Sequence, residues 1–268
     1  RNPRYVTSDC SGCGACTDAC AMKNRILDEF NYGLSKRSAI YIPFPQAIPL
    51  KAVIDEKNCL MLKNGRCSKA CIKACERKCI DFDQKEELIN IKVGTIIAAT
   101  GFKPFDAKRL SKYGYGIYPD VIDGLQFERM TNASGPTGGN VLTSKGKKPE
   151  KIAILHCVGS RDENTNSYCS RVCCMYALKH AHIAHEKTGA EVYNFYMDIR
   201  AFGKGYEEFY KRVQDEGIHF IRGKAAEIVE KGGILHVRAE DTLMGRNVDV
   251  KADMVILATG LEPCEDSA

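Results

Sequence analysis

Short apolar runs alternate with amphipathic segments along the second half of the chain, which is the pattern of an α/β fold. The apolar runs predict strands at residues 151–157, 190–199, 218–221 and 254–258. Between the first two strands, residues 168–187 predict a helix with Asn166 or Ser167 as N-cap and Gly189 as its C-terminal stop. This strand, helix, strand order favours parallel strands covered by helices.

A second amphipathic helix is predicted before Gly217, which ends it. Its apolar side chains share one face because they fall at i, i+3, i+4 and i+7; they are Tyr206, Phe209, Tyr210 and Val213. Farther along, apolar segments around Ile228, Leu235 and Val248 are separated by glycine turns and predict a small antiparallel meander. The expected architecture of residues 151–263 is therefore a Rossmann-like, nucleotide-binding-type α/β domain.

One internal repeat links this domain to an earlier segment. Residues 91–104 (IKVGTIIAATGFKP) match residues 250–263 (VKADMVILATGLEP) at six of fourteen positions, and each copy predicts a buried strand that ends in Ala-Thr-Gly. We interpret the copies as the last strands of two nucleotide-binding modules, the first of them incomplete. The tight turns would then bring backbone close to a ligand, and they comprise Thr100, Gly101, Thr259 and Gly260. Two unrelated buried strands are the alternative.

The first 88 residues have a different pattern, rich in Cys and Lys and without long apolar periodicity. Three prolines between residues 40 and 49 exclude a central strand there, so we expect an extended connector between two compact halves. Each half holds one group of cysteines. The change of pattern near residues 85–90 predicts a domain boundary.

The cysteine content decides the class of chemistry. The chain has 268 residues, enough for about two domains, and 14 Cys. The sequence has no secretory segment and no apolar run long enough to span a bilayer, so a reducing cytoplasm is expected, where clustered cysteines indicate metal or redox chemistry. Because the sequence starts with Arg, we expect a processed or excised piece of a longer protein.

The net charge of +5 does not predict nucleic-acid binding, because the basic residues are dispersed. An oxidised iron–sulfur cluster with four thiolates carries a charge of about −2. Three clusters would bring the net charge close to zero, so the basic excess is explained by buried anions.

The first cysteine group has the spacing C-x2-C-x2-C-x3-C over Cys10, Cys13, Cys16 and Cys20. This spacing is typical of a [4Fe–4S] cluster, in which soft thiolates converge on one inorganic core. Zinc is the alternative. The proline that usually follows the fourth cysteine is Ala21 here.

The second group has five thiols for four ligand positions: Cys59, Cys67, Cys71, Cys75 and Cys79. In two-cluster ferredoxins the fourth cysteine of each run binds the other cluster. One cluster is therefore predicted on Cys10, Cys13, Cys16 and Cys75, and the other on Cys20, Cys59, Cys67 and Cys71. Cys79 would be a buried spare thiol.

The third group lies where a dinucleotide fold has its phosphate loop: Cys157, Cys169, Cys173 and Cys174. The chain has no G-x-G-x-x-G sequence. A third cluster, a redox-active dithiol and inert buried cysteines are the three interpretations. Cys264 is isolated and is expected to bind nothing.

Polar residues outside the cysteine groups give little signal on their own. The histidines form no metal-binding pattern, and surface positions are the default for Lys179 on the predicted helix and for Glu128 on a short one.

Together, several segments resemble the A-type subunit of the heterodisulfide reductase family, an iron–sulfur flavoprotein. They are KRSAIYIPFPQAIP, CIDFDQ, IIAATGFKPFD, FERM, ASGPTGG, CVGSRDE, YCSRVCCMYALKHA and YMDIRAFGKGYEEFY. The resemblance implies a thioredoxin reductase-like fold with an inserted two-cluster ferredoxin-like α+β domain, FAD in a first domain, and a [4Fe–4S] cluster on the third cysteine group. The expected division is a ferredoxin-like domain at 1–88, the terminal strand of the FAD-type domain with a connector at 89–150, and the Rossmann-like domain at 151–263.

The resemblance also implies the function. By similarity, Lys179 and Glu128 are placed beside the flavin ring, although the FAD-binding strand and glycine loop are absent, so only one rim of the flavin pocket is expected. The chain would pass electrons between FAD and partners such as subunits B and C and a hydrogenase or ferredoxin-type donor. The alternatives are a zinc-stabilised interaction module and a thiol–disulfide reductase that uses Cys173 and Cys174.

Overall fold

The computed structural model describes residues 4–85 and 87–265, which fall into two compact units, Arg1–Ile96 and Ile97–Ala268. Each unit is described separately. Within the described residues, no helix is both long and apolar enough to cross a membrane.

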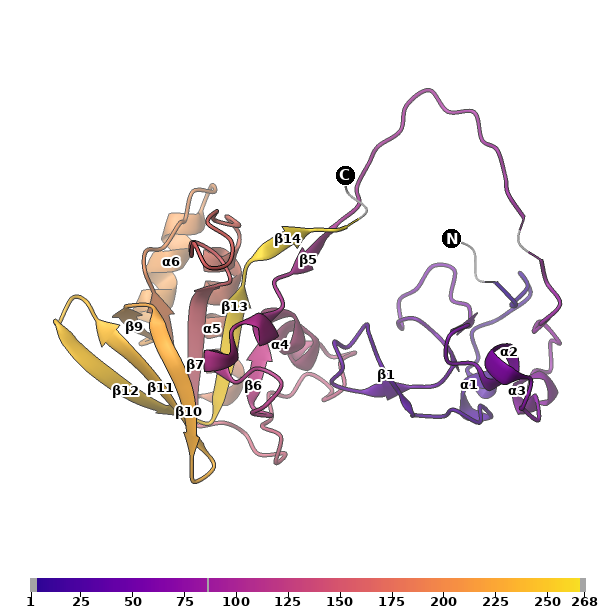
Figure 1. Cartoon of the computed structure of the whole chain (residues 1–268), viewed down its shortest axis with the longest axis horizontal. Helices are drawn as coiled ribbons and strands as arrows, with labels where there is room; N and C mark the ends of the chain where they lie inside the picture. Colours follow the sequence, from indigo (N-terminus) through magenta and orange to yellow (C-terminus); the bar gives the residue numbers. More distant parts are fainter. Residues whose placement is uncertain (1–3, 86, 266–268) are drawn as a thin grey trace. The chain divides into compact units, whose positions relative to one another are not determined.

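The second unit is built on a five-stranded parallel sheet of order β6-β13-β7-β8-β9 (Figure 1). Its strands are β6 (Val121–Asp123), β7 (Lys151–Val158), β8 (Glu191–Tyr196), β9 (His219–Arg222) and β13 (Met254–Thr259). The chain runs outward from β7 to β9 and returns to the other side of β7 as β13. The order therefore reverses between β7 and β13, and ligands of such sheets bind in the crevice at the carboxyl ends of these strands.

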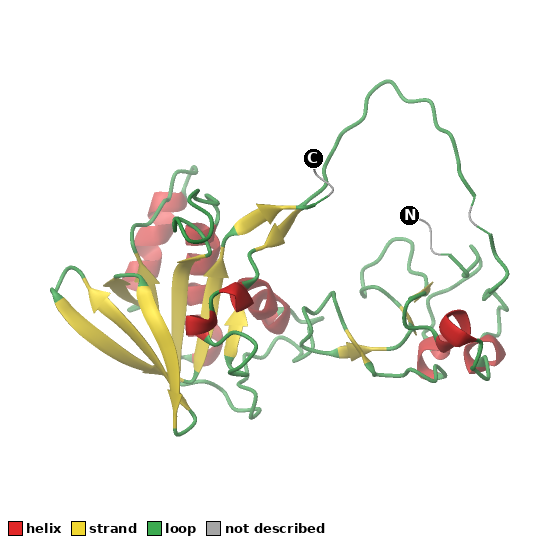
Figure 2. Cartoon of the chain, in the orientation of Figure 1, coloured by secondary structure: helices red, strands yellow, loops and turns green. Residues whose placement is uncertain are grey.

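Three helices connect the strands: α4 (Gly124–Thr131), α5 (Cys173–Thr188) and α6 (Tyr206–Asp215). Helix α5 contacts β7, β8 and β13 and lies between α4 and α6 (Figure 2). Of the predicted apolar face of α6, Val213 is fully buried and Phe209 and Tyr210 are partly buried, whereas Tyr206, at the start of the helix, is 41% exposed. Helix α5 ends, as predicted, at Gly189, whose φ of 67° is left-handed.

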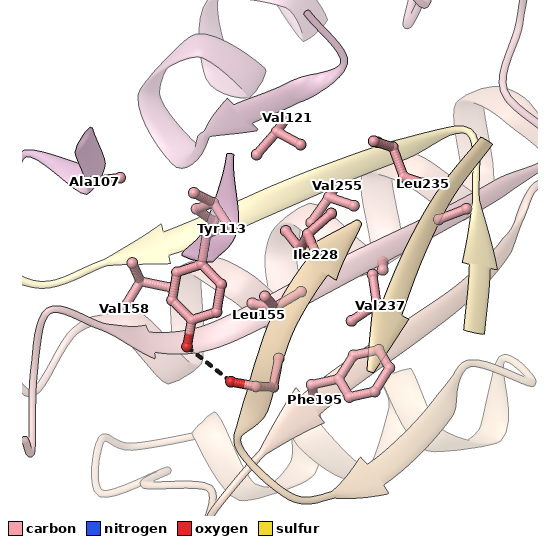
Figure 3. Close-up of a cluster of buried hydrophobic side chains, with 14 of the residues drawn as sticks. Ala107, Tyr113, Val121, Leu155, Val158, Phe195, Ile228, Leu235, Val237 and Val255 are labelled. Carbon is pink, nitrogen blue, oxygen red and sulfur yellow. Dashed lines mark hydrogen bonds between the residues drawn. The ribbon is translucent and has the colours of Figure 1, made fainter. Parts of the chain in front are cut away.

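The predicted antiparallel meander is also present. It comprises β10 (Ala225–Lys231), β11 (Ile234–Asp241) and β12 (Arg246–Ala252), paired in that order. Apolar side chains of the meander, including Ile228 and Val237, pack with Leu155 and Val255 of the parallel sheet (Figure 3). Tyr113, from the short helix η2 (Ser111–Tyr113), closes this core and donates its hydroxyl to the carbonyl of Ala225 at 2.9 Å. The unit thus has a large apolar core of its own.

The start of α5 differs from the prediction. The helix begins at Cys173 and not at residue 168, with Val172 as N-cap. Asn166 cannot cap it, because its side-chain amide donates to the Gly159 carbonyl and to Glu262. Arg171 has a left-handed φ of 65°, which interrupts any helix running through it. The residues between β7 and α5 therefore form a loop that is held by its own polar contacts.

The strand expected over residues 91–99 is not formed. These residues are extended and exposed in the described chain; Ile97, for example, is 90% exposed. An apolar strand needs a pairing neighbour on at least one edge, and the described residues offer it none. The two repeats do meet just beyond their Ala-Thr-Gly turns, where β5 (Phe102–Pro104) pairs antiparallel with β14 (Leu261–Pro263).

Residues 89–150 were expected to form one terminal strand and a connector. In the structure they contribute β6 to the parallel sheet and α4 to its helical layer. Helix α4 has a capping box in which the Asp123 side chain accepts from the Gln126 backbone and the Gln126 side chain accepts from the Asp123 backbone. A short 3₁₀ turn, η1 (Ala107–Arg109), precedes η2.

The first unit consists of short elements around a small core in which cysteines pack together with apolar side chains. Its helices are α1 (Ala15–Asp18), α2 (Leu60–Asn64) and α3 (Ala70–Lys73), and its paired strands are β1 (Ile26–Leu27) with β2 (Lys36–Arg37) and β3 (Ile40–Tyr41) with β4 (Val53–Ile54). The proline-rich stretch lies mostly in the loop between β3 and β4, so it closes a hairpin where a connector was expected. Within this unit, the buried side chain of Arg37 forms ion pairs with Glu29 and Asp55.

Candidate metal centres and an adjoining pocket

The first cavity of the N-terminal unit is lined by five sulfur atoms. They belong to Cys10, Cys13, Cys16, Cys75 and Cys79 and surround about 260 Å³. Val6, Ala52 and Ile80 supply apolar lining. The first three cysteines come from one loop and the last two from the segment after α3, so residues more than fifty positions apart in sequence share one cavity.

The backbone of the first loop is shaped by glycines. Gly12 and Gly14 have left-handed φ values of 69° and 82°, and a Cβ at Gly12 would lie 2.7 Å from the Leu50 carbonyl oxygen. The Gly12 N–H points to the Cys10 sulfur at 3.5 Å. The loop therefore turns tightly enough to bring its thiols to one side, with a backbone donor directed at one of them.

A second cavity in the same unit is lined by the thiols of Cys20, Cys59, Cys67 and Cys71, together with apolar side chains. It is narrower, about 20 Å³. Burial raises the pKa of Cys71 to about 11, and the proximity of the other three thiols adds to the effect. These four side chains therefore form one group.

The two cysteine runs exchange their last members. Cys20 ends the first run but lines the second cavity, while Cys75 ends the second run and lines the first cavity. Helices α1 and α3 contact each other and follow left-handed N-cap residues, Gly14 and Lys69. The two halves are thus built alike. The grouping of thiols is the one expected from the sequence; their role as ligands stays a prediction.

Cys75 and Cys79 form the closest thiol contact of the first cavity, with sulfur atoms 3.3 Å apart. Burial opposes ionisation of Cys75, but hydrogen bonds from three backbone N–H groups of the turn that follows, together with the contact to the Cys79 thiol, hold its pKa below the ordinary value. Burial and the neighbouring Cys75 sulfur raise the pKa of Cys79 to about 12. The two thiols therefore form a hydrogen-bonded pair in which either sulfur can be the donor.

The third group lies at the carboxyl ends of β7 and β13, in the crevice where the strand order reverses. Burial raises the pKa of Cys157 to about 11 and that of Cys173 to about 12, and the other thiols of the group lie close enough to add to both shifts. Cys173 faces the Thr259 carbonyl at 3.5 Å, whereas Cys174 faces the Asp198 carbonyl at 3.8 Å. The adjacent thiols thus point to different acceptors.

The segment from the end of β7 to the start of α5, which carries the third group, contains three non-glycine residues with left-handed φ: Cys157 (56°), Arg161 (55°) and Arg171 (65°). Each costs about 1–2 kcal/mol relative to ordinary backbone. The Arg171 N–H points to the Cys169 sulfur at 3.4 Å. Strain held in one loop around four thiols is typical of a functional site.

The side chain of Arg161 places a positive charge near the third cysteine group. Arg161 donates two hydrogen bonds to Asp198, at 2.6 and 3.1 Å, and these raise its pKa; its charge also lies close enough to Cys157 to favour the thiolate. The sequence-based prediction missed both Arg161 and Asp198, because their pairing joins residues 37 positions apart. The only signal in the sequence was the position of Arg161 four residues after Cys157.

A separate pocket of about 250 Å³ opens near the same strand ends, between α4, α5 and β14. Its walls are mainly apolar, from Phe102, Leu125, Val172 and Leu261. Glu128, Tyr176, His180 and Thr259 supply its polar lining. The Tyr176 hydroxyl donates to the Thr259 carbonyl at 2.6 Å.

Glu128 and Lys179, both predicted site residues, form an ion pair at this pocket. A hydrogen bond from His180, at 3.0 Å, is the main reason that the pKa of Glu128 falls to about 2, with Lys179 adding to it against the opposing effect of burial. Burial lowers the pKa of His180, which is 1% exposed. Since a carboxylate only accepts hydrogen bonds, His180 is a neutral Nε2–H donor. The sequence did not identify His180.

The four residues predicted to approach a cofactor do not share one site in the structure. Thr259 is buried and lines the pocket, whereas Thr100 and Gly101 are exposed. Gly260 packs against Ser160, whose Oγ would lie 2.1 Å from an added Cβ. Position 260 therefore requires glycine, because the Ser160 side chain leaves no room for a Cβ there. Cys264 forms no disulfide, and neither does any other of the fourteen cysteines, all of which lie in the described residues.

The donor sets fit iron–sulfur clusters to different degrees. No group of three or more Cys, His, Asp or Glu residues between residues 4 and 265, leaving out residue 86, converges on a single metal ion. The thiolates of a cubane each bind a different iron, so they surround a volume. The first cavity offers such a volume, about 260 Å³, whereas the second offers only about 20 Å³ in this structure.

Comparison with known proteins gives matches along the whole of this chain. It is 48% identical over 274 residues to the CoB–CoM heterodisulfide reductase iron-sulfur subunit, of type A, from Methanocaldococcus jannaschii. It is 51% identical over 274 residues to the A-type subunit of the H(2)/formate:CoB-CoM heterodisulfide,ferredoxin reductase of Methanococcus maripaludis. Both alignments cover 100% of this chain but only 40% of the relative.

A third relative, the A-type subunit of the ferredoxin:CoB-CoM heterodisulfide reductase of Methanosarcina mazei, is 45% identical over 98% of this chain and 33% of its own length. Among solved structures, a 2-naphthoyl-CoA reductase complex aligns with 63% of this chain and 20% of its own at 18% identity and a TM-score of 0.39. Thioredoxin reductase of T. acidophilum aligns with 60% of this chain and 42% of its own at 14% identity and a TM-score of 0.38. No protein-family profile matches the chain.

Proposed function

This chain is homologous along its whole length to the A-type subunit of heterodisulfide reductase and spans about 40% of it, and from this premise we propose that it conducts electrons through three [4Fe–4S] clusters. The clusters would connect a flavin to partner proteins within a larger oxidoreductase. The chain on its own would then be a conducting part and not a complete enzyme.

The observation that supports this proposal most directly is the gathering of twelve predicted ligands into three groups of four. Two groups line cavities in the first unit, and each takes its fourth thiol from the other run. The third group sits at the strand ends where a dinucleotide-binding fold would hold phosphate. Such a distribution is expected of sites for clusters and is not needed for packing.

The proposed ligands are Cys10, Cys13, Cys16 and Cys75 for the first cluster, Cys20, Cys59, Cys67 and Cys71 for the second, and Cys157, Cys169, Cys173 and Cys174 for the third. When bound, each cluster would accept and release one electron. The chain's own groups bury five of these thiols, and backbone N–H groups of Gly12, Met22 and Arg171 are directed at sulfur.

The pocket beside Glu128 and Lys179 would receive one edge of a flavin ring. Apolar walls suit a planar aromatic ring, and an ion pair at the rim places fixed charges beside it. The chain has no glycine-rich phosphate loop. Tight FAD binding would therefore need residues outside this sequence, and the ion pair would orient the ring without carrying the rest of the cofactor.

Partner proteins are proposed from the names of the relatives. Two of the names give hydrogen, or hydrogen and formate, as electron donors and the CoB–CoM heterodisulfide together with ferredoxin as acceptors. The third gives ferredoxin as the donor and the heterodisulfide as the acceptor. We infer that this chain works with donors and acceptors of that kind, through subunits of the B and C type, in the cytoplasm.

The proposal is tested on the chain purified without oxygen. A brown protein with broad visible absorption, bleached by dithionite and restored by an oxidant, is the expected result, together with electron paramagnetic resonance (EPR) signals of reduced cubanes. A colourless protein that contains stoichiometric zinc and gives no EPR signal would contradict it.

A further inference from the structure

The first cavity holds one thiol more than a cluster needs. Five cysteines line it, whereas only four line the second cavity. Cys79, the additional one, is 4% exposed, so its thiol faces the interior of the unit. A buried thiol inside a group of ligands is placed differently from an ordinary packed cysteine.

Cys79 is also in contact with two proposed ligands. Its sulfur lies 3.3 Å from that of Cys75, and the Cys10 thiol lies close enough to contribute to the raised pKa of Cys79. Cys75 and Cys79 are the ends of one tight turn, in which the Lys78 N–H donates to the Cys75 carbonyl at 3.0 Å. The two thiols therefore approach the same corner of the cavity from one short piece of backbone.

We propose that Cys79 is a reserve ligand of this cluster, able to replace Cys75 on the same iron atom. The inference rests on the proposed function, since it requires a cluster in the first cavity. Of the two clusters proposed for the first unit, only this one would then have a ligand position that two cysteines can share.

The exchange balances without any electron transfer. The Cys79 thiol gives up its proton and forms an Fe–S bond, while the bond from Cys75 to the same iron breaks and the Cys75 sulfur takes up the proton. The hydrogen bond already present between the two sulfur atoms is the path for that proton. Iron, sulfide and total charge stay constant.

The first cysteine run supplies a matched control. Cys20 ends that run as Cys75 ends the second, and the Lys23 N–H donates to the Cys20 carbonyl at 3.0 Å, as in the turn after Cys75. Four residues after Cys20 the chain has Asn24 in place of a cysteine. A lost Cys20 therefore has no thiol in reserve, although its backbone setting is the same.

The experiment compares iron content and EPR spectra of oxygen-free preparations of Cys75→Ala, Cys79→Ala, Cys20→Ala and the double variant Cys75→Ala/Cys79→Ala. We expect Cys75→Ala and Cys79→Ala to keep the iron content of the wild type. Cys20→Ala and the double variant should each lose about one iron atom of four from one cluster and show the signal of an oxidised three-iron cluster. Equal loss from Cys75→Ala and Cys20→Ala would overturn the proposal.

A second measurement uses the wild-type chain and does not depend on variant folding. Alkylation of the intact, cluster-loaded protein, followed by peptide mass spectrometry, should label both Cys75 and Cys79, each in a fraction of the molecules. Label on Cys79 alone would show a fixed Cys75 ligand and overturn the reserve role. A wild-type chain without iron would instead reject the proposed function, and the reserve role with it.

Discussion

Glu128 shows how single residues set the charge at the pocket of the second unit. Its carboxylate accepts a hydrogen bond from neutral His180 and pairs with Lys179, which keeps it ionised. The three side chains come from α4 and α5, so the ion pair also joins two helices. A fixed negative charge is thus present at the rim of the pocket before any ligand arrives.

Replacing Lys179 with Met should raise the pKa of Glu128 and destabilise the second unit by up to about 1 kcal/mol at pH 7, a small value because the pair is partly exposed and screened. A carboxyl with a lowered folded pKa stabilises the fold above its unfolded pKa of 4.5, and this contribution disappears as the pH falls toward about 2. The difference between the variant and wild type should therefore shrink over that range.

Urea unfolding at pH 7, 4 and 3 measures this difference, with Lys211→Met on α6 as the control substitution. A difference that stays constant over the three pH values would show that the Lys179 side chain acts by packing and not by charge.

Arg161 places a positive charge near Cys157 of the third thiol group. Arg161→Gln should lower the reduction potential of the proposed third cluster by tens of millivolts, since positive charge stabilises the reduced, more negative form. A redox titration followed by EPR tests this shift, and Arg212→Gln on α6 is the control. An unchanged potential would mean that the pairing with Asp198 fully cancels the effect of Arg161.

At the scale of elements, the loop after β7 depends on a glycine. Gly159 has a left-handed φ of 75°, and a Cβ there would lie 2.2 Å from the Phe105 ring. Gly189, the C-cap of α5, has a similar φ of 67° but open space around it. The two positions differ in their surroundings and not in their backbone conformation.

Gly189→Ala should therefore cost about 1 kcal/mol of stability from the left-handed backbone alone. Gly159→Ala should cost roughly 1–3 kcal/mol more, because the methyl group must displace a buried ring. Thermal unfolding of the second unit measures both values. Equal costs would show that the Phe105 ring moves aside freely.

The sequence predicts those elements whose stability comes from local patterning. The strands β7 and β13, the meander and the stop of α5 at Gly189 follow from apolar periodicity and glycine turns. The late start of α5 was not predictable, since it depends on the bonds of Asn166 to Gly159 and Glu262. The strand expected over 91–99 was wrong because a strand requires a partner that local sequence does not reveal.

The candidate site was also predictable only where local sequence determines it. Cysteine spacing predicts which thiols group together, including the exchange of Cys20 and Cys75, because one run brings several ligands into one turn. His180 and Arg161 were missed because their partners, Glu128 and Asp198, are distant in sequence. Glu128 and Lys179 were predicted only through family resemblance.

At the scale of the molecule, the two units should differ in their dependence on metal. The core of the first unit is a small cluster in which cysteines are mixed with apolar side chains, whereas the second unit has an extended apolar cluster between its sheet and meander. A small core of this kind cannot stabilise a fold alone, so metal binding would supply the folding free energy of the first unit.

Removal of iron with an oxidant and a chelator should therefore unfold residues 4–85 and leave β7 and β13 folded. Hydrogen exchange measured by mass spectrometry resolves the two units. Full protection of the first unit after iron removal would show that its folding does not need metal.

The central claim is that three thiol groups hold [4Fe–4S] clusters, and the most direct test is the iron and acid-labile sulfide content of the chain purified without oxygen. The account predicts about twelve iron and about twelve sulfide per chain. Iron and sulfide near zero, with one or more zinc ions in their place, would contradict it.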